Sequence, residues 1–191
     1  LAKDGNVELY MKVFGREKDG FHFVDPRTSF TDQEIYEHNW DLMFISHTLY
    51  LVSKDRGEAI WLNEGQRNTY MAMRGSGKEA RDAKIGNLAV GGGKTFIGIA
   101  LAAIHNVNLL LLPNASLVEQ LMKGKDGKES MEMELFKALS GKQNIIDATK
   151  EVHTITKGGD PEAVQNALNK LIAGLKDKEG TLVISDRHSM A

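Results

Sequence analysis

The first thirty residues alternate apolar and polar side chains, a pattern typical of half-buried β-strands. The apolar positions form two runs, with Val7, Leu9, Met11 and Val13 in the first and Phe21 and Phe23 in the second. The charged segment 15–20 separates the two runs. We therefore predict a β-hairpin with this segment as its loop, ended by Asp25 and Pro26.

The next segment has the pattern of a helix start. Thr31 and Glu34 are spaced as in a capping box, where each side chain binds the other's free backbone amide. Apolar residues then recur at helical spacing, so we predict one amphipathic helix from Thr31 to about Lys54. His38 and His47 lie nine residues apart, which is not a metal-binding spacing, and we expect both to be partly buried packing residues.

From Trp61 onward, apolar runs typical of strands alternate with helical patterns, which indicates a parallel sheet. The predicted strands are 85–90, 108–112, 152–156 and 181–185. The continuous apolar run 108–112 is expected to be covered on both faces. The predicted helices are 67–73, 96–104, one capped by Asn114 or Ser116, 131–139, and one that begins at Asp160-Pro161 with Val164, Leu168, Leu171, Ile172 and Leu175 on its apolar face.

The run 88–95 carries the strongest candidate chemistry, with an apolar stretch followed by Gly91, Gly92, Gly93, Lys94 and Thr95. A glycine loop between a strand and a helix, ended by Lys-Thr, is the pattern of a phosphate-binding P-loop. Glycine lets the backbone amides turn toward phosphate oxygens, and the helix N-terminus adds positive charge. We predict an ATP site in which Lys94 reaches the β- and γ-phosphates as the catalytic lysine, and Thr95 ligates Mg²⁺.

Two alternatives bear on this loop. The strict P-loop pattern has a glycine where this chain has Leu88, and only the relaxed form fits. The sequence also fits a glycine-rich turn that binds nothing. A second glycine motif, at 74–79, has Glu79 in place of the metal-binding hydroxyl, so we interpret 75–84 as a solvated loop.

Composition limits the possible functions. The 191 residues allow one α/β domain with an appendage, and the net charge of −2 gives no footprint for nucleic acid. The chain has no cysteine, no signal-peptide pattern and no apolar run near the ~20 residues of a membrane helix. We therefore expect a cytoplasmic protein without a transmembrane segment. Because the chain begins at Leu1, we also expect it to be a fragment of a longer protein.

Three segments occur in an ordered series: 62–67 with Gln66 in it, the glycine run 84–95, and 112–120. Together they resemble the first motor lobe of superfamily 2 helicases and of SecA, the preprotein translocase ATPase. The resemblance covers residues 61–191 and implies an α/β, parallel-sheet P-loop NTPase (RecA-like) core. Residues 1–60 would be an appended hairpin and helix. The resemblance also implies ATP and Mg²⁺ as ligands, a polymer substrate that is either nucleic acid or polypeptide, and a contact between Gln66 and adenine. For Gln66, an exposed residue at a helix start is an equally good interpretation.

One departure from the family concerns hydrolysis. The family uses an Asp-Glu pair at a strand end to hold Mg²⁺ and activate water, and this chain has no Asp-Glu dipeptide. Asp186 is either a degenerate version of that pair, holding the metal, or part of motif Ib. The second interpretation is favoured, and it places the catalytic strand and a second motor lobe beyond residue 191.

Three hypotheses follow. The first is the ATP-binding N-terminal lobe of a helicase- or SecA-like motor, which binds nucleotide but does not hydrolyse it as this fragment. The second is a non-catalytic interaction module on a decayed P-loop fold, with residues 1–60 as the partner surface. A compact P-loop kinase is disfavoured, because the region after 156 has lysines but no arginine pair for a lid.

Overall fold

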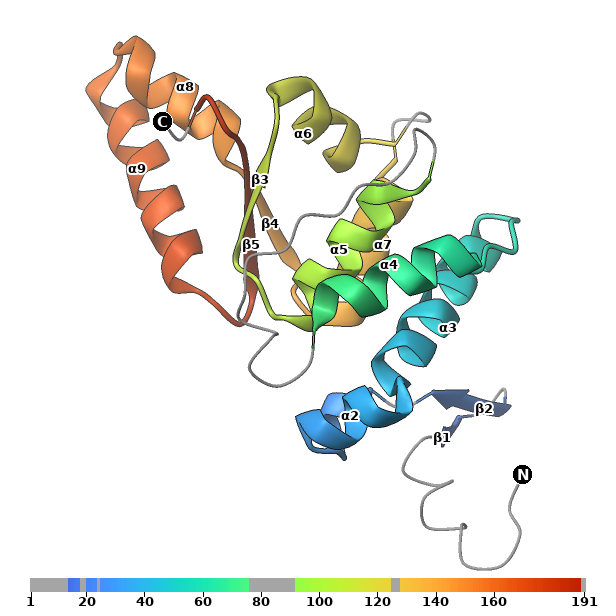
Figure 1. Cartoon of the computed structure of the whole chain (residues 1–191). Helices are drawn as coiled ribbons and strands as arrows, with labels where there is room; N and C mark the ends of the chain where they lie inside the picture. Colours follow the sequence, from blue (N-terminus) through green and yellow to red (C-terminus); the bar gives the residue numbers. More distant parts are fainter. Residues whose placement is uncertain (1–13, 18–19, 24, 76–91, 125–127, 190–191) are drawn as a thin grey trace, which may run out of the picture. The chain divides into compact units, whose positions relative to one another are not determined.

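The computed structural model describes residues 14–17, 20–23, 25–75, 92–124 and 128–189. The chain divides into two compact units, residues 1–97 and 98–191, and each is described on its own. Figure 1 shows the elements of both. Among the described residues, no helix combines the length and apolar character needed to cross a membrane.

The first unit begins with the predicted hairpin. Strand β1 (Phe14–Glu17) pairs antiparallel with β2 (Gly20–Phe23), with Phe14 opposite Phe23. The loop was predicted too long, because residues 15–17 belong to β1. The predicted strand over 7–13 lies outside the described residues.

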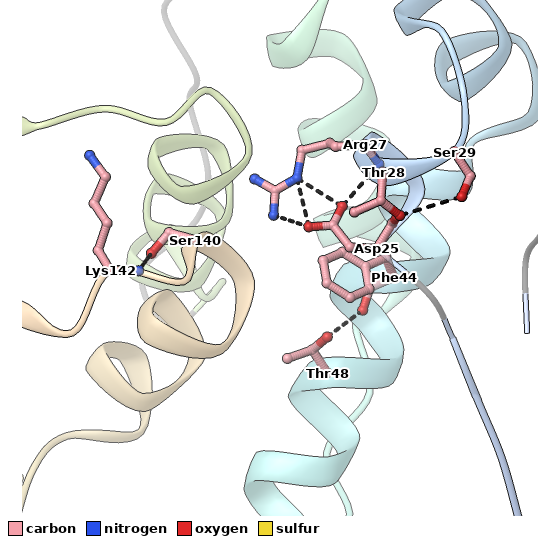
Figure 2. A network of polar contacts seen from close by, with 8 residues as sticks. All are labelled: Asp25, Arg27, Thr28, Ser29, Phe44, Thr48, Ser140 and Lys142. Atoms are coloured by element: carbon pink, nitrogen blue, oxygen red, sulfur yellow. Dashed lines mark hydrogen bonds and ion pairs between the residues drawn. The ribbon is translucent and has the colours of Figure 1, made fainter. Parts of the chain in front are cut away.

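A short 3-10 helix, η1 (Pro26–Thr28), follows the hairpin. The Asp25 carboxylate caps it, accepting hydrogen bonds from the Arg27 backbone amide at 2.9 Å and from Arg27 Nε at 2.8 Å (Figure 2). The predicted capping box is confirmed at the start of helix α2 (Asp32–His38). There the Thr31 amide donates to Glu34 Oε2 at 2.9 Å.

The single helix predicted for 31–54 is wrong in one respect, because it breaks at Asn39. Helix α3 (Trp40–Asp55) follows α2 after this residue, which has a left-handed φ of 55°. Asparagine tolerates this conformation better than most residues. Of the two histidines, His47 is half-buried as predicted, whereas His38 is exposed and stacks on Trp40 with ring centroids 4.8 Å apart.

A buried ion pair joins helix α4 (Glu64–Arg74) to the α2–α3 junction. The Arg74 guanidinium pairs with Asp41, and their side chains are only 7% and 1% exposed. Arg74 Nη2 also donates to Asn39 Oδ1 at 2.6 Å, which explains why the chain turns at Asn39. The Tyr70 hydroxyl completes the group by donating to Asp41 Oδ2 at 2.7 Å.

The second unit is a three-stranded parallel sheet with helices on both faces. The strands β3 (Leu109–Leu112), β4 (Asn144–Asp147) and β5 (Thr181–Asp186) lie in the order β3-β5-β4. In register, Leu110 faces Ile184 and Ile146 faces Val183. Helices α8 (Ala148–Lys157) and α9 (Pro161–Lys176) lie on one side of the sheet, and α6 (Ala115–Met122) and α7 (Met131–Ser140) lie on the other (Figure 1).

These elements confirm an α/β fold with a parallel sheet. The predicted strands 108–112 and 181–185 are present, whereas 85–90 lies outside the described residues. The expectation that 108–112 is covered on both faces is wrong, because Leu111 is 50% exposed. Asn114, one of the two predicted caps, accepts the Leu117 amide at 3.0 Å and begins α6.

The strand predicted at 152–156 is wrong, since these residues form half of helix α8. The β-branched threonines of this segment fit into the helix because their hydroxyls donate hydrogen bonds to carbonyls one turn earlier, from Thr154 to Lys150 and from Thr156 to Val152. The Asp147 side chain caps the helix by accepting the Thr149 amide at 3.1 Å. The strand that sequence reasoning missed is β4, which has only two apolar residues.

Helix α9 begins at Asp160-Pro161 as predicted, but its apolar face was partly misjudged. Leu168, Ile172 and Leu175 are exposed, whereas Ala167 and Gly174 are buried. Small residues face the sheet because α9 lies close to it. A Cβ at Gly174 would come 2.4 Å from Ile146 Cδ1 and 3.2 Å from Val183 Cγ2.

The apolar helix α5 (Lys94–Ile104) agrees with the one predicted at 96–104. A buried lysine, Lys142, hydrogen-bonds the backbone just after the end of this helix. The Lys142 side chain is fully buried, and its Nζ donates to the Val107 carbonyl at 2.9 Å. Its backbone amide donates to Ser140 Oγ at 3.1 Å (Figure 2). Burial lowers the pKa of Lys142, and the carboxylates of Glu179 and Asp177 oppose this shift.

The buried ion pair predicts a large loss of stability when one partner is removed. Arg74→Met leaves the Asp41 carboxylate buried without its cation, and we expect a loss of about 3–5 kcal/mol in the free energy of unfolding of the first unit. Both tryptophans of the chain, Trp40 and Trp61, lie in this unit, so urea denaturation followed by tryptophan fluorescence measures it. Lys54→Met, at an exposed position of α3, is the control. Equal midpoints for the two variants would contradict the prediction.

Candidate functional site

The glycine loop leads directly into α5. Gly92 and Gly93 precede the helix, and Gly93 has a left-handed φ of 76°, which favours glycine. Lys94 and Thr95 are the first two residues of α5, and both are exposed. Within the described residues, neither side chain has a hydrogen-bond or ion-pair partner. Gly91 lies outside the described residues.

The first backbone amides of α5 have no hydrogen-bond partner within the helix. Its first intrahelical bond is donated by the Ile97 amide to the Gly93 carbonyl at 3.3 Å. The amides of residues 94–96 precede that bond, so they have no partner within the helix. Together with the Lys94 ammonium and the Thr95 hydroxyl, they form a group of donors and positive charge suited to an anion.

Gln66 lies against this loop. Its Nε2 is 3.4 Å from the Gly92 carbonyl oxygen, and a Cβ added to Gly93 would lie 2.0 Å from the same nitrogen. The side-chain oxygen of Gln66, Oε1, takes part in a capping box at the start of α4, where it accepts a hydrogen bond from the Asn63 backbone amide at 3.0 Å. Gln66 is thus a helix-start residue, and its half-buried side chain also contacts the candidate phosphate loop.

Asp186 lies at the end of β5, and its carboxylate accepts hydrogen bonds from the turn that follows the strand. Its carboxylate accepts hydrogen bonds from the His188 amide at 3.1 Å, from the Ser189 amide at 3.3 Å and from the Ser189 hydroxyl. Chiefly the Ser189 hydroxyl, and then these amides, hold the pKa of Asp186 below its usual range, although burial opposes them. A carboxylate has about four acceptor positions, so this turn already uses most of them.

The described residues contain no group of three or more His, Asp or Glu side chains arranged to hold a metal ion. Asp186 as a magnesium ligand stays a prediction. It belongs to the second unit, whereas Gln66, Gly92, Gly93, Lys94 and Thr95 belong to the first.

A pocket of about 600 Å³ opens at the carboxyl end of the parallel sheet. Its lining comes from the three segments that leave the strands: the start of α6, helix α8, and the turn after β5. The polar side chains in it are Thr149, Lys150, His153, Thr156, Asp186, His188 and Ser189. Such edges are common ligand sites in α/β proteins. Sequence reasoning missed this pocket because it assigned 152–156 to a strand. The polar residues after each strand end were the available signal.

Comparison with known proteins found no matching family model, no matching curated protein and no matching solved structure. The interpretation of the site therefore rests on the residues and their geometry.

The left-handed backbone at Gly93 predicts that Gly93→Ala destabilises the first unit. A non-glycine residue in this region costs about 1–2 kcal/mol, and its methyl group would displace the Gln66 amide from the loop. We expect a lower urea midpoint by tryptophan fluorescence. Gly98→Ala, in the middle of α5 with nothing within 4 Å of the added Cβ, should instead be neutral or stabilising; because Gly98 belongs to the second unit, its unfolding is followed by far-ultraviolet circular dichroism. A loss of stability as large in Gly98→Ala would contradict this explanation.

The lowered pKa of Asp186 predicts acid sensitivity in the second unit. Because the folded state holds the proton less tightly than the unfolded state, this carboxylate stabilises the fold at neutral pH. That contribution decreases as the pH falls below the unfolded value of about 4. Urea denaturation followed by far-ultraviolet circular dichroism between pH 2.5 and 7 measures it. Asp186→Asn should lower stability at pH 7 and flatten the acid dependence. An unchanged pH profile in this variant would show that Asp186 does not contribute.

Proposed function

We propose that this chain binds a nucleoside triphosphate, ATP with Mg²⁺, on the loop Gly92–Thr95, as the nucleotide-binding N-terminal lobe of a helicase- or SecA-like motor. In this proposal the amides of residues 94–96 and the Lys94 ammonium contact the phosphates. The Thr95 hydroxyl contacts the metal, and Gln66 reads the adenine. The family part of the proposal rests on the ordered resemblance of residues 61–191.

The contact between Gln66 and the glycine loop carries this proposal. The two are 26 residues apart in sequence, and the resemblance to motor lobes assigns them to the same nucleotide, one to the base and the other to the phosphates. A turn that binds nothing has no need of a distant amide beside it. The exposed Lys94 side chain at the start of α5 is accessible to a phosphate group.

Hydrolysis is not part of the proposal. The carboxylate of Asp186 is engaged by its own turn, and the chain has no Asp-Glu dipeptide. These same observations favour the alternative, a non-catalytic interaction module on a decayed P-loop fold. In that alternative, nucleotide has no effect on the protein.

Nucleotide binding is tested by thermal unfolding with tryptophan fluorescence as the readout. Mg-ATP at 100 times its dissociation constant should stabilise the first unit by about 2.7 kcal/mol. Lys94→Ala should remove most of this effect, whereas the control Lys54→Ala, at an exposed lysine of the same unit, should keep it. If millimolar Mg-ATP and Mg-ADP leave the wild-type curve unchanged, the interaction-module alternative is favoured.

A second arm of the experiment tests Gln66. Gln66→Glu keeps an oxygen that can accept the Asn63 amide, so the capping box is retained while the amide donor is lost. The ratio of ATP affinity to tripolyphosphate affinity should fall about tenfold, the equivalent of one good hydrogen bond. An unchanged ratio would assign Gln66 to the helix start alone.

A further inference from the structure

We propose that the pocket at the carboxyl end of the second unit's sheet binds a small phosphate-bearing anion. This inference goes beyond the nucleotide proposal, because the pocket is formed entirely by residues 115–189 and contains none of the glycine loop.

Three side chains of the lining can donate hydrogen bonds to an anion. Lys150, His153 and His188 supply one ammonium and two imidazoles, from α8 and from the turn after β5. All three side chains are exposed and accessible to a ligand. The lining also contains the Asp186 carboxylate, which accepts hydrogen bonds from the amides of His188 and Ser189 and from the Ser189 hydroxyl, and these donors partly offset its negative charge.

The nearest competitor for Lys150 is weak. Its Nζ lies 3.5 Å from Asp147 Oδ2, but the lysine side chain is 74% exposed. An ion pair with such exposure contributes little, typically below about 1 kcal/mol. In addition, the other carboxylate oxygen of Asp147 already accepts the Thr149 amide. A phosphate group can therefore recruit this ammonium at little cost.

Thr149 supplies an observation independent of charge. Its hydroxyl oxygen is buried in the pocket lining, and no atom of the described residues satisfies hydrogen-bond geometry with it. The hydroxyl is nevertheless directed at Asp186 and helps to lower the pKa of that carboxyl as a hydrogen-bond donor, although its geometry falls outside that of a normal hydrogen bond. Buried polar atoms in native proteins normally have a partner. A phosphate oxygen in the pocket provides a better-placed one, and Ala115, the first residue of α6, borders the same space.

Size and net charge favour a compact ligand over a polymer. A volume of about 600 Å³ is within the usual range for small-molecule sites. An extended nucleic acid requires a basic stripe along the surface, and this chain has a net charge of −2. The expected ligand is therefore a small molecule that carries a phosphate group, and inorganic pyrophosphate is a suitable probe for it.

The test is a titration with pyrophosphate in the full chain carrying Lys94→Ala, which removes the glycine-loop lysine. Isothermal titration calorimetry gives the affinity, and histidine-selective NMR shows whether the imidazole signals of His153 and His188 shift. We expect saturable binding and shifts at both histidines. Adding Lys150→Met or His188→Gln should weaken binding about tenfold each, the equivalent of one charge-assisted hydrogen bond.

Matched controls are available in the same unit. Lys176→Met and His105→Gln replace an exposed lysine and an exposed histidine that do not line the pocket, and each should change the affinity less than twofold. Three results would overturn the proposal: no shift of either histidine up to 10 mM pyrophosphate, equal affinities for pocket and control variants, or displacement of pyrophosphate by a single-stranded oligonucleotide that binds more tightly. The last result would assign the surface to a polymer. Because Lys94→Ala is present throughout, failure here leaves the nucleotide proposal intact.

Discussion

The burial of strand β5 is the constraint on which the second unit depends. All six of its residues are buried, because β3 and β4 pair with its two edges and helices cover both sheet faces. Parallel strands require crossover connections, so the segments leaving all three strands emerge at one edge. That geometry brings Ala115, Thr149 and His188 to one pocket although they are far apart in sequence. The pocket is thus a consequence of how the sheet is covered.

Local signals in the sequence predicted the ends of helices well and the identity of one strand badly. The caps at Thr31, Asn114 and Asp160 were predictable, because a side chain and the amide it binds are within three residues of each other. The β-branched run 152–156 was misassigned, since its hydroxyl bonds and its packing against α9 and β5 override intrinsic propensity. Similarly, nothing local indicates that Arg74, 35 residues away, binds Asn39 where the predicted helix breaks.

The two candidate sites also differ in whether neighbouring residues in the sequence reveal them. The glycine loop could be found from the sequence because its donors are contiguous, from Gly92 to Thr95. Its contact with Gln66 was not predicted, because the resemblance to motor lobes suggested only a contact between Gln66 and adenine. The pocket residues are spread over 75 positions, from Ala115 to Ser189, and most of the polar ones are ordinary surface residue types. Only the sheet topology identifies them as a group, so sequence reasoning could reach Asp186 alone.

Binding and chemistry make different demands on these residues. Among the described residues, Asp41 and Asp186 are the two buried carboxylates, and both accept hydrogen bonds from protein donors. Hydrogen bonds to a charged group are stronger than those between neutral groups, so releasing either carboxylate to hold a metal or activate water would destabilise its turn or helix junction. The cations carry no such cost: Lys94 and Lys150 are exposed and can contact an anion without breaking a strong bond. The two sites proposed above therefore require only binding of phosphate groups and no cleavage.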